Sequence, residues 1–251
     1  MNIKPRLYYL REYLFPLGCA SCGEALLNAE ESYYGICEGC KLMFDAELKN
    51  ERRCLVCGKP LVTEKETCLL CREEGGAAKP RYNEKIEKIR SVFPYKGKFK
   101  AALGAYKFKK HIAAANFFIH CLNTVLEEII IDSGGPDGLT EAAWVPVPPR
   151  PGKIKKQGWD QIEFLAGRLE KYSSLPVKRC LKRLPLRSQK ELNREERGGN
   201  LKGRILYVKP PPKTAILFDD VITTGATLNV CAGALLEGGS EKVYAVCLFY
   251  D

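Results

Sequence analysis

The residues with the most specific chemistry in this chain lie between positions 215 and 227, in the sequence AILFDDVITTGAT. The apolar residues 215–218 predict a buried strand, and Asp219 and Asp220 follow at the point where that strand is expected to end. Ligands of open α/β sheets bind at the carboxyl ends of the strands. Two adjacent carboxylates at such a place suit the cis hydroxyl groups of a sugar, which they can hold directly or through a metal ion.

The loop after these acids has the composition of a phosphate-binding turn. It contains Thr223, Thr224, Gly225, Ala226 and Thr227, and a helix is expected to begin near Thr227. Gly225 can adopt a positive φ angle, which lets successive backbone N–H groups point inward, and the helix N-terminus favours an anion. The favoured ligand is a sugar phosphate with a free cis-diol. The alternative is a strand–turn–helix connection in which the Thr-Gly pair only caps the helix.

These residues closely resemble the signature for 5-phosphoribosyl-1-pyrophosphate (PRPP) in type I phosphoribosyltransferases. The resemblance implies that Asp219 and Asp220 hold the ribose 2- and 3-hydroxyls and that the loop 223–227 holds the 5-phosphate. It also implies Mg²⁺ as the ion that accompanies PRPP. Asp219 and Asp220 are therefore candidates both for ligand binding and for catalysis.

A group of basic residues is expected to lie near the same crevice. Residues 143–147 predict a second buried strand, which Pro148 and Pro149 stop, and Arg150 follows them. Lys153, Lys155 and Lys156 come next. If this strand lies beside the strand that carries the acids, Arg150 and Lys153 can stabilise a departing pyrophosphate together with Mg²⁺. The alternative is a surface loop with ordinary lysines.

Eight of the 12 cysteines form four Cys-x-x-Cys pairs before residue 72: Cys19/Cys22, Cys37/Cys40, Cys54/Cys57 and Cys68/Cys71. Two such turns supply the four thiolates of a closed tetrahedral zinc site. Sequential pairing predicts two structural zinc ribbons, although interleaved pairing and an iron–sulfur cluster remain open. Disulfides would need an oxidising compartment, and a redox site would need one such motif instead of four. The single cysteines Cys121, Cys180, Cys231 and Cys247 are expected to be small core residues.

The rest of the chain alternates predicted strands and helices, which indicates an α/β fold with a mostly parallel sheet. Strands are expected at residues 89–95, 143–147, 205–208, 215–218 and 243–249, and helices at 98–131 (with a break), 161–171 and 228–236. A short amphipathic helix is expected before Cys19. The Gly-Ala-rich segment 73–80 separates two expected domains. Residues 1–76 are expected to form a helix and a double zinc ribbon, and residues 77–251 are expected to form a phosphoribosyltransferase-like domain.

The order of these motifs is similar to that of the ComF-type proteins, including the GntX-like members. The matching positions outside the cysteines and the PRPP-type loop are Tyr106, Lys107, residues 145–148, Gly158, Gln161, Gln189, Leu192, Arg197, Asn200 and Gly203. Lys107 and Lys153 are counted with the loop as expected PRPP-binding residues. The chain departs from the family pattern at Gln157, where an arginine is expected, at Asp160, where an asparagine is expected, and at Leu186, where a threonine is expected.

The formal net charge of +10 agrees with a polyanionic partner or with a pyrophosphate site. The family resemblance implies natural competence, single-stranded DNA and a competence helicase or another DNA-uptake protein as partners. The N-terminal sequence lacks the features of a signal peptide, and no apolar run was expected to span a membrane, so a cytoplasmic protein is expected. Phosphoribosyl transfer is one hypothesis. A non-catalytic ligand sensor that handles nucleic acid or helps to use DNA as a nutrient is the other, and a metabolite-sensing transcriptional regulator is a third that lacks a DNA-reading motif.

Overall fold

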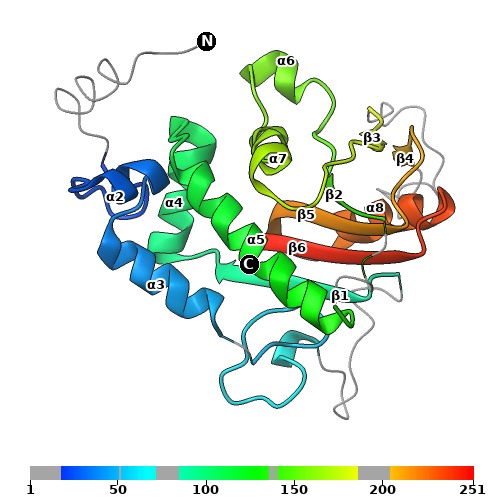
Figure 1. Ribbon diagram of the computed structural model, residues 1–251, viewed down its shortest axis with the longest axis horizontal. Helices are drawn as coiled ribbons and strands as arrows, with labels where there is room; N and C mark the ends of the chain where they lie inside the picture. The colour runs from blue at the N-terminus through cyan, green and yellow to red at the C-terminus, as the bar shows by residue number, and fades with distance from the viewer. Residues whose placement is uncertain (1–17, 51, 72–84, 136–138, 140, 186–203) are drawn as a thin grey trace, which may run out of the picture.

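The computed structural model describes residues 18–50, 52–71, 85–135, 139, 141–185 and 204–251. Within these residues, the main sheet consists of four parallel strands in the order β1 (Lys88–Pro94), β6 (Lys242–Tyr250), β5 (Thr214–Ile222) and β2 (Ala142–Pro146) (Figure 1). The predicted α/β fold with a mostly parallel sheet is confirmed. Because β2 pairs directly with β5, the Arg150 segment leaves the sheet beside the acidic pair.

The two faces of this sheet are covered by different helices. In β5, Ile216 and Phe218 belong to the core that also contains α5 (Ala114–Asp132) and α7 (Gln161–Tyr172). Ala215 and Leu217 belong instead to the core formed with α8 (Ala226–Glu237). Burial on both faces explains why these strands have continuous apolar sequences without strict alternation.

Most predicted elements are present with small shifts, but two were missed. The predicted helix at 98–131 is broken into α4 (Gly97–Lys109) and α5, with Lys110 in the left-handed region at φ 54°. Prediction missed α6 (Lys153–Gln157), whose five residues are all at least partly exposed and therefore give no apolar period. It also missed β3 (Leu181–Arg183), a short strand that pairs antiparallel with β4 (Ile205–Tyr207).

The strand that carries the acids is longer than predicted, and this corrects the placement of Asp219 and Asp220. β5 does not end at Phe218, because its pairing with β6 continues from Asp219 opposite Cys247 to Ile222 opposite Tyr250. Successive side chains of a strand point to opposite faces. Asp220 therefore follows Phe218 toward α4 and α7, and Asp219 follows Leu217 toward α8.

The cysteine-rich region contains α2 (Ala29–Tyr34), α3 (Glu38–Leu48) and the short 3₁₀ helix η1 (Leu69–Cys71). α3 shares the core of the main sheet. The ring of Phe44 is fully buried, and its centroid lies 4.8 Å from that of Phe93, 4.7 Å from Phe99 and 5.2 Å from Phe117. The first ribbon and the α/β domain are thus joined by one apolar cluster. The predicted boundary at residues 76 and 77 and the predicted N-terminal helix lie outside the described residues.

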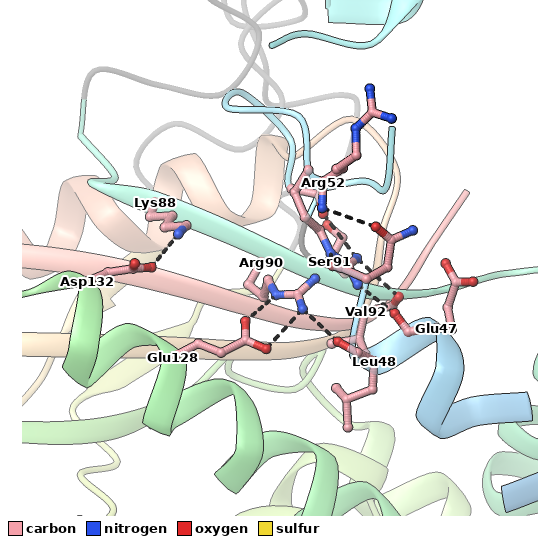
Figure 2. Close-up of polar contacts among 12 residues, drawn as sticks. Glu47, Leu48, Arg52, Lys88, Arg90, Ser91, Val92, Glu128 and Asp132 are labelled. Carbon is pink, nitrogen blue, oxygen red and sulfur yellow. Dashed lines mark hydrogen bonds and ion pairs between the residues drawn. The ribbon is translucent and has the colours of Figure 1, made fainter. Parts of the chain in front are cut away.

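Polar contacts also connect the cysteine-rich region to β1 (Figure 2). The buried guanidinium of Arg90 donates to both carboxylate oxygens of Glu128 on α5, at 2.7 and 3.1 Å, and to the carbonyl of Leu48 at 2.9 Å. Arg53 donates to the carbonyl of Ser91 at 2.5 Å. The end of α3, the start of the second ribbon and α5 therefore all meet β1.

Gly58, in the second ribbon, packs directly on β1. Its φ is 70°, and a Cβ there would lie 2.1 Å from the carbonyl oxygen of Ile89 and 2.7 Å from the amide nitrogen of Ser91. We expect Gly58→Ala to lower the free energy of unfolding by about 2–4 kcal/mol, because both the backbone conformation and the space exclude a methyl group. Chemical denaturation measures this. Gly39→Ala, in open space on α3, is the control and is expected to be neutral or slightly stabilising.

α5 is the one helix in the described part of the chain that is long and apolar enough to cross a membrane by length and composition. No such run was expected from the sequence. However, 56% of the apolar window is buried inside the protein, and the helix packs on α7 and the sheet. We therefore assign α5 to the core of the α/β domain.

Candidate functional site

A cavity of about 710 Å³ lies at the carboxyl ends of β2 and β5, where the sequence predicted a ligand site. The expected residues that line it are Lys107, Arg150, Lys153, Asp219, Asp220, Thr223 and Thr227. They come from three separate parts of the chain. Of the other expected residues, Thr224, Gly225 and Ala226 lie in the same loop but outside the described lining.

In the loop between β5 and α8, Gly225 has the positive φ angle that the sequence suggested. Gly225 is buried with φ 70°, precedes the first helical residue Ala226, and its carbonyl accepts from the N–H of Asn229 at 3.0 Å. Thr223 and Thr224 are exposed. α8 thus begins beside the pocket at Ala226, two residues before the predicted range 228–236.

Asp220 is held by two side-chain donors from neighbouring helices. One carboxylate oxygen, Oδ2, lies 2.8 Å from Lys107 Nζ of α4 and accepts from Gln161 Nε2 of α7 at 2.5 Å. The carboxylate is 9% exposed. A ligand hydroxyl that donates to this oxygen must therefore compete with donors already in place.

Asp219 lies in a different environment. Burial, and after it repulsion from Asp220, raises the pKa of Asp219 to about 8 from an ordinary value near 3.8. The N–H of Asp220, which donates to Asp219 Oδ1 at 2.8 Å, lowers the pKa but does not offset these effects. Ionisation of Asp219 in this buried place therefore lowers the stability of the folded protein.

The raised pKa of Asp219 predicts a pH-dependent stability difference. Protonated Asp219 stabilises the folded protein, and this contribution is fully present below about pH 4. It is lost as the pH rises through about 8. We expect Asp219→Asn to gain stability relative to wild type between pH 5 and 8.5, by about 1–3 kcal/mol at the upper end. Denaturation of both proteins across this range measures it. A constant difference at all pH values would contradict the prediction.

Three further residues of the pocket were given no role by the sequence. Asp160 and Gln161 stand at the start of α7, and Arg183 stands in β3. Asp160 had a usable local signal, because an acid before an amphipathic helix is a good N-cap, and its side chain does accept from the N–H groups of Ile162 and Glu163. Arg183 had none, since a three-residue strand leaves no pattern.

Tyr106 belongs to the family match, and its neighbour Trp159 stands where the family pattern has a phenylalanine. Tyr106 is fully buried and donates to the carbonyl of Gln161 at 2.7 Å, while Trp159 packs edge-on against Tyr106, with ring centroids 5.4 Å apart. Trp159 is thus a packing residue. The remaining matches, Gln189, Leu192, Arg197, Asn200 and Gly203, together with the departure at Leu186, lie outside the described residues.

The eight cysteines form two clusters with sequential pairing, Cys19/Cys22/Cys37/Cys40 and Cys54/Cys57/Cys68/Cys71. In each cluster all four sulfur atoms lie within 4.8 Å of one another. Zn–S bonds of about 2.3 Å in a tetrahedron require sulfur atoms about 3.8 Å apart. The Cys22–Cys37 and Cys57–Cys68 sulfur pairs are 3.6 and 3.8 Å apart. The donor sets therefore fit zinc, and interleaved pairing is excluded.

The four single cysteines behave as predicted. Cys121, Cys180, Cys231 and Cys247 are all buried and belong to the core of the α/β domain. They lie outside both four-cysteine clusters.

Comparisons with known proteins agree with this division of the chain. Residues 10–77 match the family model of the double zinc ribbon domain. The chain is 27% identical to Competence protein ComFC of Streptococcus pneumoniae over 239 residues, which cover 90% of this chain and 96% of the relative. It is 26% identical to Competence protein ComFC of Bacillus subtilis over 190 residues, which cover 74% and 72%.

A shorter match concerns a different class of protein. Over 35 residues the chain is 54% identical to the Ribose-phosphate pyrophosphokinase of Bacillus subtilis, which covers 14% of this chain and 11% of the relative.

The fold and the cysteine clusters define an α/β protein with an N-terminal double zinc ribbon and two structural zinc sites. Together with the long matches to two competence proteins, they support a protein of the ComF kind. The same matches support a role in competence.

Proposed function

We propose that this protein binds PRPP, or a closely related ribose phosphate, with Mg²⁺ in the pocket at the carboxyl ends of β2 and β5. One observation carries the proposal. The pocket brings Asp219, Asp220, Thr223 and Thr227 together with the cations of the Arg150 segment, which is far from them in sequence. The short match to a pyrophosphokinase adds support.

The roles follow from the chemistry of each part. Asp219 and Asp220 accept from the ribose hydroxyls, and the loop 223–227 at the start of α8 takes the 5-phosphate, because a helix N-terminus favours an anion. Arg150 and Lys153 face the pyrophosphate from the β2 side. Mg²⁺, when bound with PRPP, would neutralise part of the pyrophosphate charge.

Calorimetry with PRPP and Mg²⁺ tests this assignment. We expect saturable heat at one site per chain for PRPP, and weaker binding for 2-deoxyribose 5-phosphate than for ribose 5-phosphate, because the deoxy sugar lacks the 2-hydroxyl. Absence of heat from the wild-type protein with PRPP would remove the assignment.

The cations of the pocket favour a catalytic form of this proposal. In phosphoribosyl transfer, the bond between C1 and the pyrophosphate oxygen breaks, the electron pair leaves with pyrophosphate, and an acceptor forms a new bond to C1. Arg150 would stabilise the charge that develops on the leaving group. Release of pyrophosphate that depends on an added acceptor and is lost in Arg150→Gln would establish it. Binding without any release would leave the non-catalytic ligand sensor.

We propose further that the protein acts in the cytoplasm during competence and binds single-stranded DNA there, with a helicase or other uptake protein as partner. The similarity to two competence proteins supports the process. α6 supports the DNA contact, because its side chains Lys155 and Lys156 are exposed beside the pocket. Phosphate backbones bind such clusters with release of counterions.

Reversal of these two charges tests the contact surface. Lys155→Glu/Lys156→Glu is expected to weaken binding of single-stranded DNA about tenfold and to reduce the slope of log K against log salt by about 1.4. Gel shifts over a salt series measure both. Lys209→Glu/Lys242→Glu, which makes the same charge change at the amino end of the sheet, is the control. Equal effects of the two variants would place the contact elsewhere.

A further inference from the structure

A continuous chain of polar contacts crosses the pocket from α6 to α4. Lys153 Nζ lies 2.5 Å from Asp160 Oδ2 and also donates to Gln161 Oε1. The other end of the same amide, Gln161 Nε2, donates to Asp220 Oδ2 at 2.5 Å, and Lys107 Nζ approaches that oxygen at 2.8 Å. Gln161 is therefore the bridge between the acid proposed to hold the ribose diol and a lysine proposed to face pyrophosphate.

The backbone around Gln161 is fixed by its neighbours. Its carbonyl accepts from the buried hydroxyl of Tyr106 at 2.7 Å. Asp160, which is 5% exposed, caps α7 by accepting from the N–H groups of Ile162 at 2.9 Å and Glu163 at 3.1 Å. Because the main chain is held on both sides, the side-chain amide is the part of Gln161 that can respond to a ligand.

The chain also leaves both lysines engaged with acids. Lys107 is paired with Asp220, and Lys153 is paired with Asp160, whose carboxylate is 2% exposed. A cation that is already paired in a partly dry site attracts a further anion less strongly than a free one. A ligand hydroxyl that donates to the Asp220 carboxylate therefore displaces Gln161 Nε2 or Lys107 Nζ, which contact it in the free protein.

From these contacts we infer that Gln161 is a positioning residue that couples the two halves of the pocket. A ribose hydroxyl that donates to Asp220 Oδ2 displaces the amide of Gln161 and the ammonium group of Lys107. Once its amide is displaced from Asp220, Gln161 no longer holds Lys153 in place, and Lys153 can turn toward an anion. This inference rests on the proposed function and adds to it a preference for ligands that carry both a cis-diol and a pyrophosphate.

The coupling has a measurable consequence with separate ligands. Binding of a diol and binding of pyrophosphate should each tighten the other by the same factor, because coupling free energies are reciprocal. We expect Mg²⁺-pyrophosphate to bind about fivefold to tenfold tighter when ribose 5-phosphate is saturating. In Gln161→Leu, this factor should fall to about one.

Calorimetric titration of pyrophosphate with and without ribose 5-phosphate, at one ionic strength, measures the factor. In Gln161→Leu, ribose 5-phosphate alone should bind as well as in wild type or tighter, because it no longer displaces the amide. A purely structural role would instead weaken every ligand together and lower the melting temperature. Asn123→Leu, which removes a side-chain bond to the carbonyl of Tyr172 outside the pocket, is the control for loss of an amide.

Gln161→Glu provides a second variant that keeps the size of the side chain. It retains an acceptor for Lys153 but loses the donor to Asp220, so the coupling should also disappear. A wild-type protein that binds PRPP but shows a factor of one, or a Gln161→Leu protein with unchanged coupling, would overturn the inference and leave the proposed function intact. Absence of PRPP binding to the wild type would remove both.

Discussion

Replacement of both Asp219 and Asp220 by asparagine is expected to weaken PRPP binding by at least about a hundredfold. Each carboxylate that accepts from a ligand hydroxyl contributes about 1.5–3 kcal/mol, and every 1.4 kcal/mol corresponds to a factor of ten. The direction of the effect is diagnostic. Removal of negative charge from the pocket should by itself strengthen the binding of an anion, so a loss of affinity means that the hydroxyls have lost their partners.

Calorimetry with PRPP and Mg²⁺ on the wild-type protein and on Asp219→Asn/Asp220→Asn provides this measurement. The matched control is Asp45→Asn/Asp132→Asn, which makes the same two substitutions at ion pairs outside the pocket, with Lys41 and Lys88. The control should bind PRPP within about twofold of wild type, because these charges are largely screened by salt. Equal or stronger binding by the pocket variant would contradict the assignment of the diol site.

Loss of one zinc ligand from the first ribbon is expected to destabilise the α/β domain as well as the ribbon. Cys37 caps α3 and Cys40 lies within it, so the metal fixes the start of the helix that places Phe44 and Leu48 in the shared core. Metal binding supplies folding free energy in such small sites. We expect Cys40→Ala to lower the free energy of unfolding by about 3–5 kcal/mol.

The zinc content identifies the cause of this loss. Metal analysis should fall from two ions per chain, one for each cluster, to one in Cys40→Ala. Cys121→Ala removes the same atom from a buried cysteine outside the clusters, and it should keep both ions and cost only about 1 kcal/mol. Separate unfolding of the ribbon, with an unchanged transition for the α/β domain, would show that α3 does not support the shared core.

Much of the site was predictable because its motifs are local. The spacing of a Cys-x-x-Cys pair places its two sulfur atoms close together within one short turn. The glycine of the Thr-Thr-Gly-Ala-Thr loop was expected to adopt a positive φ, and the structure shows this at Gly225. The alternation of apolar strands and amphipathic helices also predicted the parallel sheet. In each case the relevant geometry is set within a few residues of sequence.

Prediction from the local sequence failed where an element is too exposed or too short to show an apolar period. α6 lies on the surface, so it has no apolar face to detect, and β3 is too short to show a period. The end of β5 was placed too early because acids do not resemble strand residues. Pairing with β6 through Ile222 opposite Tyr250 holds them in the strand against that preference.

By itself, the sequence determined which side chains could bind a sugar phosphate and which could bind zinc, because residue type and short spacing define those chemistries. The tertiary structure decided how they are combined. Pairing of β5 with its neighbours sends Asp219 and Asp220 to opposite faces of the sheet, and packing of α7 on that sheet brings Gln161 to Asp220 across 59 positions of sequence. Such contacts depend on how whole elements dock, and no spacing along the chain encodes them.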